Sequence, residues 1–275
     1  MKQRRTVFFV SDQTGVTAET MGHSLLTQFD SLEFRTVTLP FIAGIDKARE
    51  VVSRINLAAR EQGTRPVVFA TFVDTEVRDI VRGAECLFLD FFDAFLGPLE
   101  REFGELSTHA LGRAHGVTDI RAYTQRISAT NFALANDDGA HTHDYDRADV
   151  ILIGVSRSGK TPTCVYLAMH YGTFAANYPL TDEDLQEGRL PPAVAPFRAR
   201  LFGLTIASDR LQQIRQERRP DSRYASTRQC AWEVRAAERM FTKEGVPYLD
   251  TTECSIEEIA ARVLERLGIP RHVRP

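Results

Sequence analysis

A strand-like run over residues 149–154 ends in a glycine and leads into a short loop of small and polar residues. The loop matches the pattern G-x-x-x-x-G-K-[ST] at every fixed position and reads Gly154-Val155-Ser156-Arg157-Ser158-Gly159-Lys160-Thr161. Glycines in such a loop let successive backbone N–H groups face phosphate oxygens, while Lys160 adds a full positive charge and the Thr161 hydroxyl can hold Mg²⁺. The helix expected after the loop contributes the partial positive charge of its N-terminus. The sequence therefore predicts that this loop binds the phosphates of a nucleotide.

Two neighbouring residues refine this prediction. Arg157 places a second cation in the loop, which is useful where several phosphates, or an incoming phosphate, must be held. Pro162 follows Thr161 in the first turn of the expected helix, where its missing N–H costs little. The strand-like run before the loop and the amphipathic helical pattern after it favour a nucleotide site over a chance glycine turn.

Phosphoryl transfer also needs a carboxylate that orients the metal or takes a proton from the attacking hydroxyl. Three positions in the sequence compete for this role. They are Asp90 at the end of "CLFLD", Asp250 at the end of "VPYLD", and the pair Asp137 and Asp138 in a polar turn before the loop's strand. An acidic residue at a strand end is more often a helix cap than a catalyst, so the residue types alone do not choose among the three.

Two other polar clusters each have a functional and a structural interpretation. Residues 214–230 carry five arginines that could recognise phosphate or an acidic partner, or form a solvated helix face offset by Glu217 and Asp221; they are Arg215, Arg218, Arg219, Arg223 and Arg228. Near the N-terminus, a strand–loop–helix junction could line a second site, although a helix cap is the stronger expectation; its polar residues are Ser11, Asp12, Thr14 and Gly15.

The elements that must position these residues alternate between strand and helix. Strands are expected at 6–10, 34–40, 66–72, 86–92, 149–154, 174–179, 201–206 and 246–250, with helical patterns between most of them. Such alternation predicts an α/β fold with parallel strands and crossover helices. The polar stretch 135–149 is the best linker, so we expect an N-terminal α/β domain over 1–145 and a P-loop α/β domain with a mainly parallel sheet over 146–275.

Bulk composition limits the functional classes. The chain has 275 residues and a formal net charge of −3, so the protein as a whole is not expected to bind nucleic acid. Its longest apolar runs fall short of the roughly 18 residues of a membrane helix, and the apolar part of its first residues is too short for a signal peptide. The four cysteines form no Cys-x-x-Cys pair, which favours the reducing cytoplasm.

Several stretches together resemble one family, the bacterial phosphoenolpyruvate synthase regulatory proteins and their pyruvate phosphate dikinase relatives. The stretches are "SDQTG", "VTLPF", "LANDDG", "GVSRSGKTPT", "AANYP", "LFGLTI" and "SRYASTRQC". The resemblance runs from Phe8 to about Leu267. This combination is far more specific than the glycine loop alone.

The resemblance implies a bifunctional enzyme. In one direction, the β-phosphate of ADP goes to a threonine of the target synthase and inactivates it. In the other, inorganic phosphate removes that group by phosphorolysis and pyrophosphate is released. The family's acidic pair maps onto Asp137 and Asp138, which favours them over Asp90 and Asp250 as catalytic residues beside Lys160 and Arg157. Phosphoenolpyruvate synthase is the expected partner, with the dikinase as an alternative target.

Other interpretations stay open at this point. A P-loop kinase for small molecules would carry a long arginine-bearing lid after the loop. A nucleotide-sensing module without transfer activity would not need Asp137 or Asp138. Mg²⁺ is the expected metal, with Thr161 as a ligand, and a homodimer is one assembly that the sequence allows.

Overall fold

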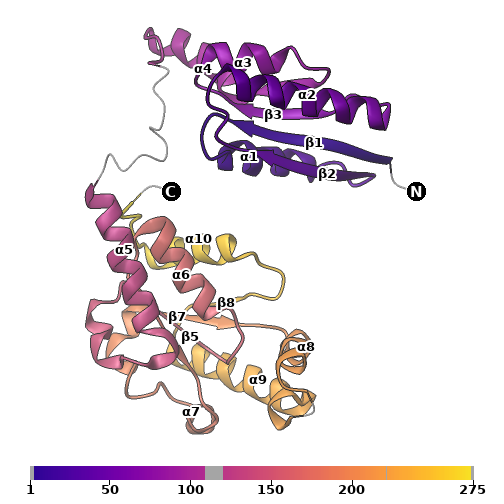
Figure 1. The fold of residues 1–275 in the computed structure, drawn as a ribbon. Helices are drawn as coiled ribbons and strands as arrows, with labels where there is room; N and C mark the ends of the chain where they lie inside the picture. The colour runs from indigo at the N-terminus through magenta and orange to yellow at the C-terminus, as the bar shows by residue number, and fades with distance from the viewer. Residues whose placement is uncertain (1–2, 109–119, 221, 274–275) are drawn as a thin grey trace. The chain divides into compact units, whose positions relative to one another are not determined.

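The computed structural model describes residues 3–108, 120–220 and 222–273 (Figure 1). The chain forms two compact units, Met1–Gly116 and Val117–Pro275. Each unit is built on its own four-stranded sheet. The predicted α/β class and the two-unit organisation are therefore confirmed.

All strands of the N-terminal sheet are parallel and lie in the order β2-β1-β3-β4. They are β1 (Gln3–Ser11), β2 (Leu32–Leu39), β3 (Val67–Thr71) and β4 (Leu87–Asp90). Four helices connect and cover them: α1 (Val16–Leu26), α2 (Ile45–Gln62), α3 (Thr75–Arg82) and α4 (Phe91–Phe103). Separate apolar clusters pack α2 with α3 and α1 with α4, which indicates one helical layer on each face of the sheet.

The second sheet is also parallel, in the order β6-β5-β7-β8. Its strands are β5 (Val150–Gly154), β6 (Ala175–Pro179), β7 (Leu201–Thr205) and β8 (Tyr248–Asp250). The helices are α5 (Ile120–Ala135), α6 (Lys160–Tyr171), α7 (Asp182–Glu187), α8 (Ser208–Arg218), α9 (Thr227–Glu244) and α10 (Ile256–Leu267). Four 3₁₀ segments complete this unit: η1 (Asp137–Gly139), η2 (Thr142–Arg147), η3 (Ala195–Arg200) and η4 (Arg223–Ala225).

Strand β5 lies in the interior of the second sheet, between β6 and β7. Every residue of β5 is buried, as expected for a parallel strand covered on both faces. Helices α5, α6 and α10 contribute to one apolar cluster and α9 contributes to the other. Burial on both sides fixes the place where β5 ends, and the glycine-rich loop begins at that point.

The division between the units falls earlier than the sequence suggested. We expected a boundary near residue 145, but the compact units divide between Gly116 and Val117. Tyr145 is fully buried in the second unit's core, and its hydroxyl donates to the Asn177 carbonyl at 2.9 Å. Residues 120–145 therefore belong to the P-loop unit, because their apolar side chains pack there.

Most expected elements occur close to their predicted positions. The run 86–92 divides into β4 and the start of α4, one of the two outcomes that its pattern allowed. The last helix, α10, begins after Ser255, whose hydroxyl accepts from the Glu258 N–H at 3.2 Å. In the part of the chain that the structure describes, we find no helix long and apolar enough to cross a bilayer.

Candidate active site

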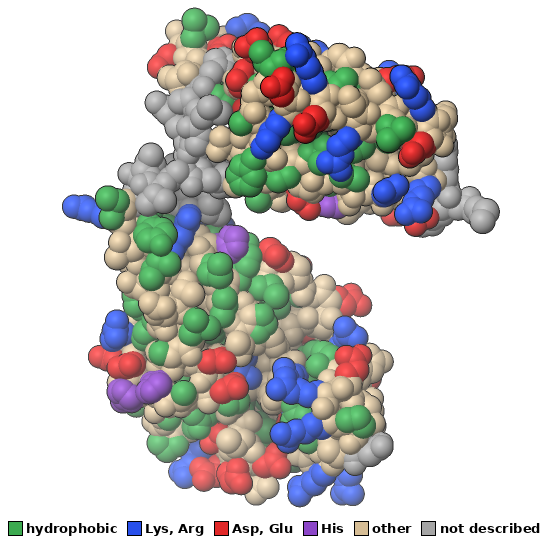
Figure 2. Space-filling model, viewed as in Figure 1, with side chains coloured by type: hydrophobic (Ala, Val, Ile, Leu, Met, Phe, Trp, Pro, Cys, Tyr) green, Lys and Arg blue, Asp and Glu red, His purple; other side chains and the backbone are tan. Residues whose placement is uncertain are grey.

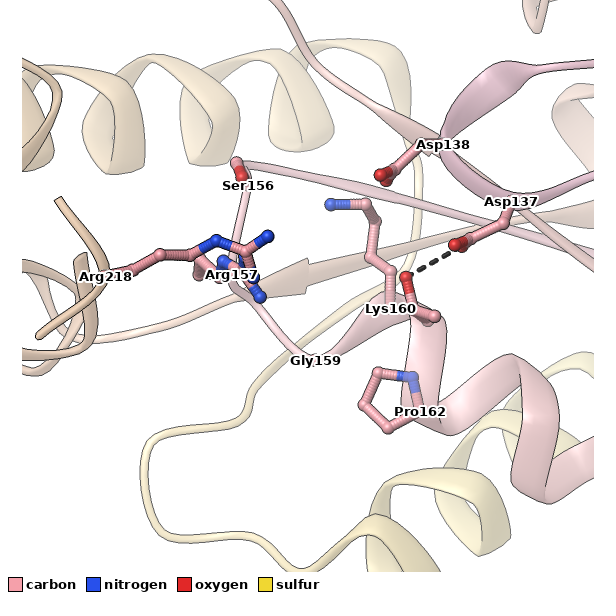
Figure 3. Close-up of a pocket in the computed structure, with 9 residues that line it drawn as sticks. Asp137, Asp138, Ser156, Arg157, Gly159, Lys160, Pro162 and Arg218 are labelled. Carbon is pink, nitrogen blue, oxygen red and sulfur yellow. Dashed lines mark hydrogen bonds between the residues drawn. The ribbon is translucent and has the colours of Figure 1, made fainter. Parts of the chain in front are cut away.

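A pocket of about 500 Å³ opens where β5 ends and α6 begins (Figure 3). The loop and the first turn of α6 contribute one wall, which consists of Ser156, Arg157, Gly159, Lys160, Thr161 and Pro162. Asp137 and Asp138 come from η1, and Arg218 comes from the C-terminal end of α8. We call this the P-loop pocket. Its position follows the rule that ligands of parallel α/β sheets bind beyond the carboxyl ends of the strands.

The loop is held tightly against β7. A Cβ atom on Gly154 would lie 2.3 Å from the Leu204 carbonyl oxygen, a separation that only a glycine avoids. Gly159 and Arg157 adopt the left-handed backbone conformation, at φ of 91° and 78°. The side chains of Val155 and Ser158 are buried and do not line the pocket. Of the eight predicted loop residues, Gly154, Val155 and Ser158 therefore shape the loop without presenting side chains to the pocket.

Lys160 is almost completely buried at the first position of α6, with 4% of its surface exposed. Its Nζ donates to the carbonyl oxygens of Gly154 at 3.0 Å and Val155 at 2.9 Å. Burial lowers the pKa of Lys160 to about 8, although the charge of Asp138 opposes this shift. The amine is thus a poorly solvated cation, which a phosphate anion in the pocket would stabilise.

The two acidic residues of η1 have different environments. Asp137 is held in place, because its Oδ1 accepts from the Thr161 hydroxyl at 2.7 Å and from Asn177 Nδ2 at 2.5 Å. Asp138 adopts a left-handed conformation with φ 49°, and its backbone N–H donates to Asn177 Oδ1 at 3.1 Å. The Asp138 carboxylate accepts no hydrogen bond from any residue that the structure describes, and Figure 3 shows it pointing toward the Lys160 amine. The Asp137 carboxylate is therefore held by two hydrogen bonds, whereas the Asp138 carboxylate faces the pocket.

Asn177 is a site residue that the sequence reasoning missed. It lies on β6, next to β5, is fully buried, and fixes both acidic residues of η1 through its side-chain amide. The stretch "AANYP" contributed to the family resemblance, but an amide within an apolar strand gives no sign of its partner. Only the pairing of β5 with β6 brings the side chain to η1.

Arg215, from the arginine cluster, is buried beneath the loop. Its guanidinium makes a bidentate ion pair with Glu233 of α9, with N–O distances of 2.6 and 2.9 Å. It also lies over the Tyr224 ring, 4.0 Å from the ring centre. It also donates to the Ser156 carbonyl at 3.1 Å. Burial tends to lower the Arg215 pKa, but the hydrogen bonds and charge of Glu233 outweigh it and raise the pKa. This residue positions the loop and does not face the pocket.

The competing carboxylates have structural roles. Asp90 lies in the N-terminal unit and caps α4 by accepting from the Asp93 N–H at 3.0 Å, while its other oxygen accepts from the Phe72 N–H at 3.3 Å. Burial raises the Asp90 pKa. Asp250, at the end of β8, accepts from the backbone and hydroxyl of Thr252 and does not line the P-loop pocket.

The expected cap near the N-terminus takes a different form. Helix α1 begins after Gly15, which has φ 79° and makes no side-chain cap. Asp12 instead accepts from the backbone N–H groups of Val73 and Asp74, at 2.7 and 3.0 Å. The Ser11 hydroxyl donates to the Thr71 carbonyl at 3.1 Å. These polar residues therefore join the ends of β1 and β3 and do not cap the helix that follows them.

The oxygen donors beside the loop fit Mg²⁺. Among the described residues, no three His, Cys, Asp or Glu side chains are grouped as a metal site. Mg²⁺ in phosphate sites usually takes only one or two protein oxygens and completes its shell with substrate phosphates and water. Thr161 Oγ1 and Asp137 Oδ1 lie 2.7 Å apart at the edge of the P-loop pocket and could supply those two.

Fold and site together define a class: a parallel α/β protein whose glycine-rich loop has the P-loop pattern and faces a carboxylate pair. A family model described as "Kinase/pyrophosphorylase" matches residues 7–264. The chain belongs to this family. Its membership supports phosphotransfer as the class of reaction that the protein catalyses.

Close relatives span essentially the whole chain. A protein of Alcanivorax borkumensis is 55% identical over 271 residues, which cover 98% of this chain and all of the relative. Relatives from Alkalilimnicola ehrlichii and Legionella pneumophila strain Philadelphia 1 are 53% and 51% identical, and the alignments cover 98% of this chain and 98% and 100% of theirs. All three carry the name "Putative phosphoenolpyruvate synthase regulatory protein". The resemblance found from the sequence motifs is therefore confirmed.

Proposed function

We propose that the protein regulates phosphoenolpyruvate synthase by reversible phosphorylation of a threonine. ADP donates its β-phosphate in the inactivating reaction, and inorganic phosphate removes the group in the activating reaction, giving pyrophosphate. The family and the names of the relatives support this target. The observation that carries the proposal is that one pocket is lined by two cations, Lys160 and Arg157, and by the Asp137–Asp138 pair.

The loop is the proposed binding site for the two phosphates of ADP. Backbone N–H groups at the start of α6 and the Lys160 ammonium would hold the anion. Arg157 would neutralise negative charge on the phosphoryl group while it is transferred. Lys160 now donates to two loop carbonyls, so binding a phosphate exchanges those contacts for a stronger, charge-assisted one. The same loop can hold phosphate or pyrophosphate, which allows one pocket to serve both directions.

Asp138 is the proposed general base. In the phosphorylating direction, its carboxylate takes the proton of the threonine hydroxyl as the new O–P bond forms and the bond between phosphorus and the AMP oxygen breaks. In phosphorolysis, a phosphate oxygen attacks the phosphothreonine phosphorus, and the departing threonine oxygen receives a proton from the Asp138 carboxyl. One group serves both steps, as microscopic reversibility requires.

Asp137 is proposed as a support that keeps Thr161 in place through their 2.7 Å hydrogen bond. Thr161 and Asp137 would hold Mg²⁺, which when bound neutralises phosphate charge. The cytoplasm is the proposed location, because the four cysteines are all unpaired, as is usual in a reducing compartment. We propose no nucleic-acid or membrane partner.

Phosphorolysis gives the sharpest test of this function. Phosphorylated synthase incubated with the protein and inorganic phosphate should regain activity and release one pyrophosphate per phosphate removed. Reactivation without pyrophosphate would mean simple hydrolysis and would contradict the proposal. Reactivation of a phosphorylated dikinase but not of the synthase would assign the same chemistry to the alternative target.

A further inference from the structure

A second, smaller hollow adjoins the P-loop pocket. It has a volume of about 240 Å³ and is lined by Ser156, Arg157, Arg218, Arg219 and Tyr224. We call it the arginine hollow. Ser156, Arg157 and Arg218 line both cavities, so the two share a wall. Figure 3 shows the Arg157 and Arg218 side chains on that shared side.

Three of the five residues that line the arginine hollow are arginines. Within residues 3–108, 120–220 and 222–273, no carboxylate forms an ion pair with Arg157, Arg218 or Arg219. Figure 2 shows Lys and Arg side chains gathered over the region of α8 and α9 that Figure 1 labels. Three guanidinium groups beside one small hollow favour an anion with several oxygens, because arginine donates its hydrogen bonds in a planar fork.

The Ser156 and Tyr224 side of the hollow is held by several contacts. The hydroxyls of Ser156 and Tyr224 share a hydrogen bond of 2.9 Å. The Tyr224 ring lies on the buried Arg215 guanidinium, which also donates to the carbonyl oxygens of Tyr224 and Ser156, both at 3.1 Å. The ion pair with Glu233 in turn fixes Arg215. These contacts hold one side of the hollow in place, against which the exposed side chains of Arg157, Arg218 and Arg219 can close on an anion.

Size distinguishes the two cavities. Pockets for whole small molecules usually span roughly 300–1,000 Å³, a range that includes the P-loop pocket and excludes the arginine hollow. The smaller volume suits a single phosphate group better than a whole nucleotide. Because the two cavities share a wall, a phosphate in the hollow would lie beside a phosphate held by the loop.

We propose that the arginine hollow is a second phosphate site, which binds a phosphate dianion while the loop holds another phosphate group. The inference rests on the proposed function, in which phosphorolysis brings inorganic phosphate and a phosphorylated threonine together in one site. The dianion is either free inorganic phosphate or the phosphate of a phosphorylated threonine. Arg219 lines only the hollow, so it is the residue that separates this site from the P-loop pocket.

Calorimetric titration of the ADP-saturated full-length protein tests the second site. Inorganic phosphate and O-phosphothreonine are titrated separately into wild type, Arg219→Gln, Arg219→Lys and the control Arg210→Gln. Arg210 is an exposed arginine of α8, the helix that ends just before Arg219, and it lines neither cavity. At least one titrant should bind to wild type, and Arg219→Gln should weaken it about fivefold to tenfold through loss of a charge-assisted contact. Arg219→Lys should restore part of the affinity, and Arg210→Gln should match wild type.

The outcomes separate the two hypotheses. Failure of ADP to bind in the first place contradicts the proposed function. If ADP binds but neither titrant does, or if Arg219→Gln and Arg210→Gln bind the titrant equally, the second site does not exist. Tighter binding of inorganic phosphate identifies the hollow as the site of the attacking phosphate. Tighter binding of O-phosphothreonine identifies it as the site of the modified target residue.

Discussion

Lys160 should make the proposed ADP binding depend on pH in a definite direction. Its pKa is about 8 in the ligand-free protein, and the protonated form is the one that attracts phosphate. The charge is present below pH 8 and is lost as the pH rises above it. We therefore expect the dissociation constant for ADP to rise above pH 8, by at most about tenfold per pH unit.

The variant Lys160→Arg is the matched control for this prediction, because arginine stays charged throughout that range. Calorimetry from pH 7 to 9.5 should show a steep rise in the dissociation constant for wild type and a nearly flat profile for the variant. Parallel profiles would show that Lys160 is not the titrating group. Lys160→Ala should lose ADP binding while keeping its circular dichroism spectrum.

Asp138 is the residue on which the proposed chemistry depends most. General-base catalysis is worth about 10²–10⁴ in rate, so Asp138→Asn should slow both reactions by that factor. The affinity for ADP should stay nearly unchanged, because the Asp138 carboxylate faces the pocket without bonding any described residue. Turnover measured at saturating ADP checks this.

Asp90→Asn is the comparison variant. Asp90 caps α4 in the other unit, so its change should lower the melting temperature and leave turnover near normal in the folded protein. The opposite pattern, a fully active Asp138→Asn and an inactive Asp90→Asn, would show that the base is Asp90 and not Asp138.

At the residue scale, sequence motifs predict the loop and the acidic pair but miss their supports. The pattern around Lys160 is local, so every fixed position can be read from adjacent residues. Asn177 lies 40 residues along the chain from Asp137, which it supports, and Glu233 lies 18 residues from its partner Arg215. Local patterns do not reveal such partners, since strand order brings them together.

Among elements, the junction of α8 and α9 with the loop has the largest predicted effect on stability. The ion pair between Arg215 and Glu233 is buried, with 0% and 7% of the side chains exposed. Removing one partner leaves a buried charge, which typically costs about 3–5 kcal/mol. Glu233→Ala should lower the free energy of unfolding by that amount in urea titrations.

A surface pair provides the matched control for the buried pair. Glu258 and Arg262 form an exposed pair on α10, with 43% and 50% of the side chains exposed. Glu258→Gln should cost no more than about 1 kcal/mol. Equal losses from Glu233→Ala and Glu258→Gln would contradict the view that Arg215 and Glu233 clamp the loop.

The contact of Gly154 with β7 gives another prediction at this scale. A methyl group there meets the Leu204 carbonyl at 2.3 Å, so the strand or the loop must move. Gly154→Ala should destabilise the protein by about 1–3 kcal/mol and weaken ADP binding as well. Full stability with unchanged affinity would show that the loop is not held by β7.

Element types were largely predictable, because apolar runs bounded by polar turns distinguish parallel strands from amphipathic helices. The unit boundary was not. The polar residues 135–149 resemble a linker, yet Tyr145 within them is fully buried and Asn136 is 1% exposed. A few buried side chains decide to which unit this polar segment belongs. The average composition of the segment does not reveal them.

For the whole molecule, the site lies within one unit. Every residue that lines the P-loop pocket belongs to Val117–Pro275. A fragment of residues 117–275 should therefore bind ADP with an affinity close to that of the full chain. Calorimetry on the fragment and the full chain compares the two, and a folded fragment that does not bind ADP would mean that the N-terminal unit completes the site. A homodimer stays a prediction, which sedimentation equilibrium would test.

Transfer from ADP to the synthase tests the central claim most directly. Purified phosphoenolpyruvate synthase is incubated with the protein and with ADP labelled on its β-phosphate, beside a parallel reaction with the Asp138→Asn variant. The account predicts label on a threonine of the synthase, one AMP formed for each phosphate transferred, and far slower labelling by the variant. Label that comes only from the γ-phosphate of ADP-free ATP, with none from ADP, would contradict the account.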